Sequence, residues 1–543
     1  MLESRLRFEP TRDGSHTVYV DGVALHSRYE PTREAERLVG RQIGDAAPSL
    51  VVVVGPGLGH IVAAVRRRHR HARIVSVAFD AELARHAHQD LEVAGCRSWA
   101  PGHGELMSFL RHEINELDLN SIAVVDPPAA ARIFPQAHTA AIAALRIVLA
   151  EQRGTLATTA AFGRRWIRNA IRNVLRLEQV TPLRSAGLPI VIAASGPSLE
   201  LVIAELRAAR RLCLLWALPS AVPALTAAEL TPDVIVITDA GYYGASHLFH
   251  RQTVSQIAMP LSAAPVPNLD GVATPVTLFA EGHEFERPLF AALGVAPPPV
   301  PAAGTVAASA LRLALQLQAR SVFLVGLDLC YLDLQGHARP NVAASLLNAM
   351  SSRTSPYPAL LYAHAQAAAP ERQMHAGKLL RRSTALDTYA SWFASLSVPA
   401  VAGPGLVAPP DLARVEPTPV ATPALRSISR HLLKAELRAA TRSNSPIVPV
   451  RPPWPGRDER LAVIVDLLSN WSSAIEAAAI EPPDRLAGSI ARHLIHYSAP
   501  VELMRVVAAQ RRGDPGWERQ WQSLLQGCNA FVDNLAWRVR RAS

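Results

Sequence analysis

The chain has 543 residues, of which 49% are hydrophobic and 18% are charged. This balance excludes a disordered chain and allows two to four domains with buried cores. Only 6% of the residues are aromatic, so alanine, valine and leucine must fill most of the interior. The excess of 55 basic over 45 acidic residues gives a net charge of +10, which favours anionic partners without choosing among nucleotides, acidic surfaces and nucleic acid.

The four cysteines lie far apart and form neither a C-x-x-C pair nor a zinc-type spacing, so we expect no disulfide framework and no metal finger. The first ten residues, MLESRLRFEP, lack the apolar core of a signal peptide. No uninterrupted apolar run reaches the roughly 20 residues that a membrane span needs. We therefore expect a cytoplasmic protein without a membrane span.

Residues 1–150 are predicted to form a Rossmann-like α/β domain, because strand-like and helix-like runs alternate along them. The β-branched run SLVVVV leads into the glycine turn GPGLG at 55–59, and a helical stretch then reaches the next strand, which is the order of a βαβ unit. The predicted elements are a hairpin at 16–25, strands at 49–54, 73–80 and 121–128, and a helix near 105–116.

Residues 151–187 are predicted to be linker helices within a continuous helical pattern from about 138 to 180, and 188–406 a second α/β domain. The proline-rich tract 407–423 can continue neither a helix nor a central strand, so it marks a boundary before a C-terminal helical domain at 424–543. Predicted strands of the second domain lie within 188–200, 211–220, 232–244 and 320–333.

The turn AASGPSLE at 193–200 follows a strand and opens a helix, which leaves backbone N–H groups able to bind phosphate. Gly196 permits close backbone approach, Pro197 suits an early helix position, and Ser198 adds a hydroxyl donor or cap. The competing interpretation is an ordinary strand-to-helix turn with a serine cap.

A second turn, at Gly304 and Thr305, starts a helix, and the strand after it delivers Gly326, Asp328 and Tyr331 at its carboxyl end. Ligands of open α/β sheets bind at that edge, so both turns can face one crevice. An aspartate after a strand is otherwise most often a helix cap.

Several ordered blocks resemble the motility-associated factor (Maf) glycosyltransferases, which have an MptE-like central domain. The similarity runs over most of residues 18–405. The blocks are YVDGVALHSRYEPTREAERLV, GPGLGH, FGRRWIRNAIRN with Phe162, Trp166, Asn169 and Asn173, SGPSLE, TPDVIVITDAG around Asp239, GTVAASAL, GLDLCYLDLQGHA with His337, and STALDTYASWF.

The resemblance implies a central domain similar to bacterial sialyltransferases, which use a CMP-activated sugar acid. It implies transfer of a nonulosonic acid, of pseudaminic or legionaminic type, to serine or threonine of flagellin. The central domain has no D-x-D motif, and a CMP donor with a monophosphate leaving group needs no metal, so we expect neither metal nor cofactor. Ala194 or Ser195 stands where the family has asparagine or glycine, and Tyr331 arrives one residue late. The roles implied are catalytic for His337, Asp328 and Tyr331, and substrate-binding for Gly196, Pro197, Ser198, Asp239, Gly304, Thr305 and Gly326.

The chemistry of the residues is compatible with that reaction. Turn amides and a tyrosine hydroxyl, from Tyr242, Tyr243 or Tyr331, could hold the leaving phosphate, and a neutral histidine could take the acceptor proton. His337 is the first candidate for this base and His364 the second. Either histidine could equally be an ordinary loop residue.

The first domain has a competing interpretation as a site for S-adenosylmethionine, as in methyltransferases. The residues of this possible nucleotide site are Gly55, Gly57, Gly59 and Asp80, with Asp126 after a later strand. Against it, the first strand lacks the usual carboxylate, and a recruiting or scaffold domain remains the alternative.

Two other rivals stay open: an MptE-like pterin diphosphokinase that uses ATP and magnesium, and a non-catalytic flagellin-binding chaperone. The basic stretch 164–176 could bind nucleic acid, but arginines three and four apart on one helix favour a solvated face, with Trp166, Ile167 and Ala170 packed inward. We expect no nucleic-acid partner.

Overall fold

The computed structural model describes residues 5–183, 188–251, 255–266, 274–302, 304–317, 322–375, 377–395, 454–486 and 488–542. By internal packing the chain forms two compact units, the first made of 1–164 with 468–538 and the second of 165–467 with 539–543. The last helices thus belong with the N-terminal part. The predicted division into four segments stays a prediction, and the boundary tract 407–423 lies outside the described residues.

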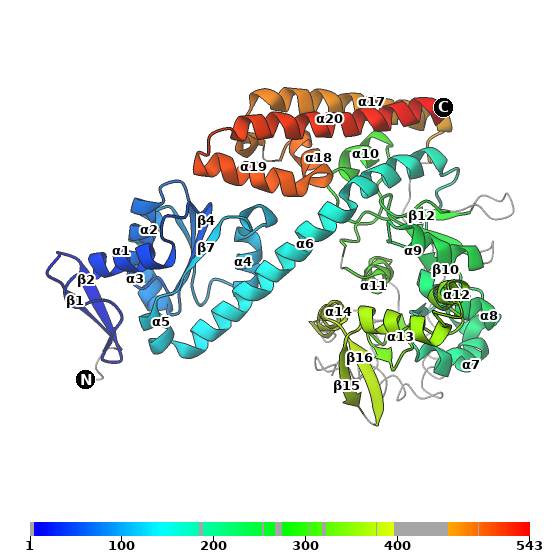
Figure 1. Ribbon diagram of the computed structural model, residues 1–543, viewed down its shortest axis with the longest axis horizontal. Helices are drawn as coiled ribbons and strands as arrows, with labels where there is room; N and C mark the ends of the chain where they lie inside the picture. The colour runs from blue at the N-terminus through cyan, green and yellow to red at the C-terminus, as the bar shows by residue number, and fades with distance from the viewer. Residues whose placement is uncertain are drawn as a thin grey trace. The chain divides into compact units, whose positions relative to one another are not determined.

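The first unit is built on a four-stranded parallel sheet of order β6-β5-β4-β7, of which β4 and β7 are labelled in Figure 1. Val51 and Val53 of β4 face a core shared with helices α1, α2 and α3, whereas Val52 and Val54 face one shared with α4 and α6. All five β4 residues are buried, which explains why the strand is a continuous apolar run. The elements are β4 (Leu50–Val54), β5 (Arg73–Val77), β6 (Cys96–Trp99), β7 (Ile122–Val125), α1 (Pro31–Gln42), α2 (His60–Arg68), α3 (Ala81–Val93), α4 (Leu106–Glu113), α5 (Pro128–Ile133) and α6 (Pro135–Arg176).

A small antiparallel sheet precedes this domain, formed by β1 (Leu6–Pro10), β2 (His16–Val20) and β3 (Val23–Ala24). The predicted hairpin at 16–25 is confirmed in β2 and β3. The sheet's apolar residues, including Val18 and Val20, share a core cluster with Leu58 of the glycine turn.

The C-terminal helices of the first unit are attached to it through a buried carboxylate. Asp118 accepts from Arg73 at 2.7 Å and from Arg511 of α19 at 3.4 Å. Burial raises the pKa of Asp118, and the two guanidinium groups oppose that rise. The helices are α17 (Arg457–Ala477), α18 (Ile490–Ser498), α19 (Pro500–Arg512) and α20 (Trp517–Ala542).

Among the described residues one helical stretch, Arg457–Ile480, is long and apolar enough to span a membrane by length and composition. Core helices of proteins pass the same test, and this helix buries Ile464, Trp471 and Ile475 inside the protein. The expectation of no membrane span therefore stays a prediction.

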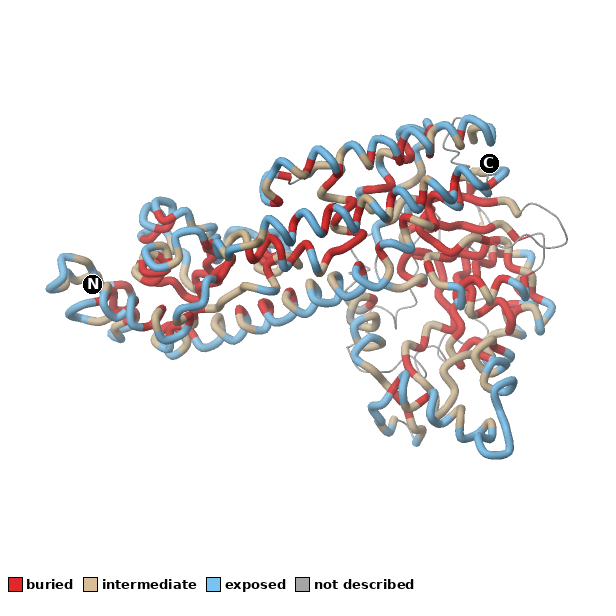
Figure 2. The backbone as a smooth tube through the Cα atoms, turned by 45° about the horizontal axis from the view of Figure 1, so that its top comes forward, coloured by how far each residue is buried: buried red, intermediate tan, exposed pale blue. Residues whose placement is uncertain are grey.

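The second unit contains a six-stranded parallel sheet of order β12-β11-β10-β9-β8-β13. The chain runs outward from β8 to β12 and then returns to the other side of β8 with β13. Figure 2 shows the strands of this sheet as buried. Helix α11 covers one face over Ile190, Ile192 and Trp216. The strands are β8 (Ile190–Ala193), β9 (Leu214–Ala217), β10 (Val234–Val236), β11 (Gln256–Met259), β12 (Val276–Leu278) and β13 (Val322–Val325).

A three-stranded antiparallel sheet and further helices complete the second unit. The strands are β14 (Tyr331–Leu332), β15 (Glu371–His375) and β16 (Lys378–Arg382), and the helices are α7 (Leu199–Ala209), α8 (Val222–Ala227), α9 (Tyr242–Ser246), α10 (Glu286–Ala292), α11 (Val306–Gln316), α12 (Val342–Ala349), α13 (Tyr357–Ala368) and α14 (Thr384–Ser395). The predicted mixed α/β class with parallel sheets is confirmed.

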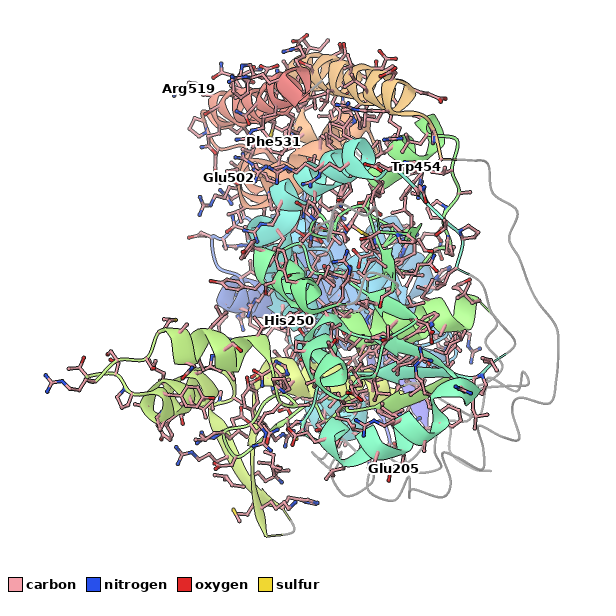
Figure 3. All side chains as sticks on the ribbon, turned by 90° about the vertical axis from the view of Figure 1, so that its right-hand side faces the viewer. Glu205, His250, Trp454, Glu502, Arg519 and Phe531 are labelled. Carbon is pink, nitrogen blue, oxygen red and sulfur yellow. The ribbon has the colours of Figure 1, made fainter. Side chains whose placement is uncertain are left out.

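The end of α6, from Arg165 onward, supports the loops at the carboxyl edge of the second sheet. The buried Asn169 donates from Nδ2 to the carbonyls of Ala240 and Ser262, at 3.1 and 3.0 Å, and Asn173 does the same to two carbonyls after β11. Trp454, labelled in Figure 3, donates its indole N–H to the carbonyl of Leu177 at 2.8 Å. Ile167 and Ala170 are buried, as predicted for the inward face of this basic helix.

Candidate functional site

The candidate site lies where the direction of strand order reverses, between β8 and β13. Open α/β sheets bind ligands at such a switch point, beyond the carboxyl ends of the strands. The two chain segments approach closely there: the N–H of Gly196 donates to the carbonyl of Gly326 at 2.7 Å. A Cβ on Gly196 would lie 2.5 Å from Asp328 Oδ2, and one on Gly326 would overlap the carbonyl of Ala194. Gly326 also has a φ of +68°, so both positions require glycine.

Asp328 and Ser198 bond directly across the switch point. The carboxylate Oδ2 accepts the Ser198 backbone N–H at 2.7 Å, and Oδ1 accepts the Ser198 hydroxyl. Asp328 is only 3% exposed. Burial raises the pKa of its carboxyl, and the two Ser198 hydrogen bonds oppose that rise. Asp328 is thus a helix cap, but of α7, which begins 129 residues earlier in the chain at Leu199.

This bond corrects the prediction that the amides of 196–198 hold a phosphate. The Gly196 N–H donates to the carbonyl of Gly326, and the Ser198 N–H donates to the carboxylate of Asp328. Pro197 has no N–H. An anion can therefore reach this turn only by displacing the Asp328 carboxylate. A phosphate must be held by other groups.

His337 lies beside this junction and is held by Ser195. The Nδ1 atom of His337 and Oγ of Ser195 are 3.0 Å apart, and Ser195 Oγ is 2.7 Å from Oγ of Ser220, which follows β9. Burial lowers the pKa of His337, and the nearby His364 lowers it further. The imidazole is therefore neutral near pH 7. When Nδ1 donates to Ser195, Nε2 carries the lone pair and can accept a proton.

The loop that carries His337 is fixed to the start of α7. Glu200 accepts from the side chain of Gln335 at 2.7 Å and pairs with the guanidinium of Arg339 at 2.9 Å. The N–H of Ala338 donates to the carbonyl of Ser195 at 2.6 Å. Tyr331 begins the loop in β14, and its ring packs so closely on Gly336 that a Cβ there would lie 2.5 Å from the ring. The ring is partly buried, and burial raises the pKa of its hydroxyl.

Asp239 follows β10 at the same edge of the sheet. Its Oδ1 accepts the N–H of Gly241 at 2.7 Å, and its side chain packs against Gly244 in α9. His247 is close enough that the charges of His337 and Asp239 affect it; burial, the main cause, lowers its pKa to about 4. The structure thus brings Asp239 and two neutral histidines to one region.

The remaining predicted site residues of the central domain lie in two other places, at the start of α9 and before α11. Tyr242 and Tyr243 are exposed, at 74% and 70%, and their rings form an edge-to-face pair at the start of α9. Gly304 and Thr305 precede α11, and a Cβ on Gly304 would lie 3.4 Å from the ring of Tyr389. Among the described residues no hydrogen bond joins Thr305 to Asp328, so the predicted convergence of the two turns is not seen as a direct contact.

A cluster of acidic residues and aromatic rings lies after β12. His283 Nε2 is 3.5 Å from Glu281 Oε2, and its ring stacks on Trp166 with centroids 4.7 Å apart. Glu286 is 1% exposed. Burial raises the pKa of Glu286 to about 7; the charge of Glu281 adds to this, and His283 opposes it. The motif EGHEFE at 281–286 was a signal for this cluster that our sequence reasoning did not use.

The glycine turn of the first unit is filled by the chain itself. The N–H of Leu58 donates to His26 Nε2 at 3.0 Å, and a Cβ on Gly57 would overlap the His26 ring. Gly55 meets Phe79 and Ala130 in the same way, and Gly59 is the left-handed residue before α2. Asp80 caps α3 and pairs with Arg5 at 2.8 Å.

The predicted nucleotide site in this domain is therefore occupied by side chains. The glycines make room for His26 and Phe79, and the Asp80 carboxylate that a ribose would need is already bonded. Sequence reasoning missed Ser195, Ser220, His247 and His26, because each acts through a contact distant in the chain. Among the described residues no group of three or more histidine, cysteine or acidic side chains is placed to hold a metal.

Comparisons with known proteins support this description of the fold. Residues 164–334 match the family model described as 6-hydroxymethylpterin diphosphokinase MptE-like. A solved structure, the Maf glycosyltransferase from Magnetospirillum magneticum AMB-1, aligns with 99% of this chain and 92% of that chain, with a TM-score of 0.55 and 13% identity. This is a Maf glycosyltransferase fold. The Maf resemblance and the MptE-like central domain predicted from the motifs are confirmed at this level.

Two relatives of the Maf-like chain are uncharacterized proteins of Treponema pallidum (strain Nichols). One is 27% identical over 319 residues, which is 59% of this chain and 66% of that protein. The other is 27% identical over 218 residues, which is 36% of this chain and 70% of that protein. The chain thus spans about two thirds of the length of each.

Proposed function

We propose that the chain is a glycosyltransferase that moves a nonulosonic acid, of pseudaminic or legionaminic type, from its CMP-activated form to serine or threonine of flagellin, in the cytoplasm. The Maf fold and the MptE-like domain support a transferase of this kind. The observation that carries the proposal is the neutral His337, oriented by Ser195 at the switch point of the second sheet.

In the proposed reaction, the acceptor hydroxyl attacks the anomeric carbon of the sugar acid. The bond from that carbon to the phosphate oxygen breaks, and CMP leaves with the electron pair. Nε2 of His337 takes the hydroxyl proton in the tautomer in which Nδ1 donates to Ser195, whose hydroxyl also lies 2.7 Å from that of Ser220. The base must be a neutral imidazole. The lowered pKa of His337 keeps its ring neutral at pH values where an ordinary histidine would begin to take up a proton.

The turn amides cannot hold the leaving phosphate, so we assign that task to the exposed hydroxyls of Tyr242 and Tyr243. They stand at the start of α9, next to Asp239. Arg165 of α6 approaches the same place, since its NH1 atom would lie 3.6 Å from a Cβ on Gly241. A guanidinium there is suited to a departing phosphate.

One experiment tests the proposal and ranks its rivals. The purified chain is heated alone and with CMP, with ATP and magnesium, or with S-adenosylmethionine, and the unfolding transition is followed. We expect CMP to raise the transition temperature through mass action. Mass measurement of flagellin incubated with a CMP-nonulosonic acid then shows whether sugar is transferred, and His337→Ala should abolish transfer while CMP protection remains. Absence of protection by any cytidine nucleotide contradicts the proposal.

The name of the matching family model supports a second candidate, a pterin diphosphokinase. That reaction would use Asp239 and Asp328 as magnesium ligands, and Asp328 would first have to release Ser198. Protection by ATP with magnesium, and none by CMP, would favour the kinase. Flagellin binding with unchanged flagellin mass would favour a chaperone.

A further inference from the structure

The first unit contains a cavity of about 600 Å³ at its own switch point. In this sheet the chain runs outward from β4 to β6 and returns with β7 on the other side of β4, so the reversal lies between β4 and β7. The cavity is lined by Ile61, in the first turn of α2 after β4, and by Pro127 and Pro128, directly after β7. It therefore occupies the place where open α/β sheets bind ligands.

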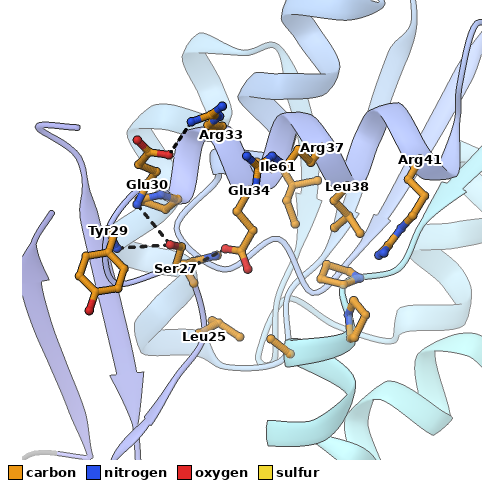
Figure 4. Close-up of a pocket in the computed structure, with 16 residues that line it drawn as sticks. Leu25, Ser27, Tyr29, Glu30, Arg33, Glu34, Arg37, Leu38, Arg41 and Ile61 are labelled. Carbon is orange, nitrogen blue, oxygen red and sulfur yellow. Dashed lines mark hydrogen bonds and ion pairs between the residues drawn. The ribbon is translucent and has the colours of Figure 1, made fainter. Parts of the chain in front are cut away.

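The floor of this cavity is apolar. Leu25, Leu38 and Ile61 line it together with the two prolines, and these three side chains are 5%, 9% and 4% exposed. Figure 4 shows Leu38 and Ile61 side by side beneath α1. The volume lies in the range of small-molecule sites, and such a floor suits a flat apolar or aromatic body.

The rim of the cavity carries three arginines. Arg33, Arg37 and Arg41 follow one another at four-residue spacing along α1, and all three line the cavity (Figure 4). Arg33 is paired with Glu30 at 3.2 Å. Among the described residues, no hydrogen bond or ion pair joins Arg37 or Arg41 to another group, and both are exposed.

The acidic side chains of the cavity are already engaged. Glu34 accepts the N–H of Ser27 at 2.7 Å, and Glu30 is the partner of Arg33. Glu30 immediately precedes α1 and Glu34 lies in its first turn, whereas Arg37 and Arg41 stand in the second half of the helix. The lining thus carries three arginines against two glutamates, which leaves one net positive charge, and Arg37 and Arg41 remain available to an anion.

We propose that this cavity is a binding site for a small organic phosphate, with its apolar body on the Leu38 and Ile61 floor and its phosphate between Arg37 and Arg41. A phosphate monoester carries nearly two negative charges near pH 7, which matches two arginines. The cavity adjoins the filled glycine turn, because His26, which accepts the N–H of Leu58, also lines the cavity. It is independent of the transferase proposed for the second unit.

The test is titration calorimetry of the full chain with AMP as the probe. Adenosine and inorganic phosphate are titrated in parallel. We expect AMP to bind more tightly than either, because only AMP fills the floor and meets both arginines. The double variant Arg37→Gln/Arg41→Gln should weaken AMP binding at least about tenfold. Ala129→Phe, which adds a ring to the cavity lining, should block AMP binding.

The matched control is Arg85→Gln/Arg146→Gln, which removes the same charge from two exposed positions that do not line the cavity. This control should bind AMP like the parent, and equal unfolding temperatures of both double variants show that each is folded. The proposal is overturned if AMP binds the cavity double variant as tightly as the parent. Equal binding of AMP and adenosine, or of AMP and phosphate, overturns it as well, as does failure of AMP to bind the parent.

Discussion

The bond between Asp328 and Ser198 allows a decisive test of what the aspartate does. Asp328→Ala removes the acceptor of a buried N–H and of the Ser198 hydroxyl. A buried amide left without a partner costs about 1–3 kcal/mol, and loss of a charged cap at the start of a helix costs about 1 kcal/mol more. We therefore expect a loss of about 3 kcal/mol, which lowers the unfolding temperature of a unit this large by about 5 °C.

Asp328→Asn is the matched control, because it keeps the shape and changes only the charge. The amide oxygen can accept the Ser198 N–H, and the amide NH₂ can donate to the Ser198 oxygen. We expect its unfolding temperature within about 2 °C of the parent. If the carboxylate also serves the reaction, Asp328→Asn loses transferase activity although it stays folded.

The assay is thermal unfolding followed by far-UV circular dichroism at neutral pH and one scan rate, with Ser198→Ala and the double variant Ser198→Ala/Asp328→Ala beside the others. Since the two residues touch, their effects should fail to add by about 0.5–3 kcal/mol. An Asp328→Ala protein that unfolds within about 1 °C of the parent, or strict additivity of the two substitutions, would refute this account.

Three further outcomes follow from the same unit. Gly326→Ala places a Cβ against the carbonyl of Ala194 at a φ of +68°, so it should cost at least about 2 kcal/mol and reduce soluble yield; a parent-like unfolding temperature would contradict this. The folded protein holds the Glu286 proton more tightly than the unfolded chain, since the pKa of this carboxyl rises from 4.5 to about 7. The resulting contribution to the free energy of unfolding is on the order of 3 kcal/mol. It is complete below about pH 4.5 and is lost as pH rises through about 7. Glu286→Gln should therefore flatten the dependence of unfolding temperature on pH between about pH 5 and pH 8, and an unchanged slope would show that the carboxyl does not titrate there. Ser195→Ala should lower kcat about tenfold or more while CMP protection stays, because it releases the ring of His337; equal loss of CMP protection would point to a structural role.

The sequence predicted those parts of the fold that depend on local pattern. The apolar run at 49–54 forms β4, and the strand predicted within 188–200 is β8. The helical pattern at 138–180 corresponds to α6, Pro135–Arg176. Strands β11 and β12, of four and three residues, were not predicted. The first part of the predicted C-terminal helical domain, 424–453, lies outside the described residues.

The candidate site was only partly predictable for a physical reason. Strand order places the turn after β8 beside the end of β13 in any sheet with this topology, so the meeting of 196–198 with Asp328 could be expected. Which partner takes each N–H depends on side-chain geometry that no local pattern encodes. Asp328 accepts the Ser198 N–H that had been assigned to a phosphate, and His26 fills the glycine turn, where it accepts the Leu58 N–H.

The chain leaves the first unit after Arg164 and comes back to it only at Leu468. During synthesis, the N-terminal sheet is complete long before the ribosome reaches α19, and until then the buried Asp118 lacks the Arg511 partner that α19 brings. A nascent chain stopped before that helix would keep only Arg73 against this carboxylate. Maturation of the first unit is thus coupled to completion of nearly the whole polypeptide, and fragments ending within the second unit should be poor substitutes for the intact protein.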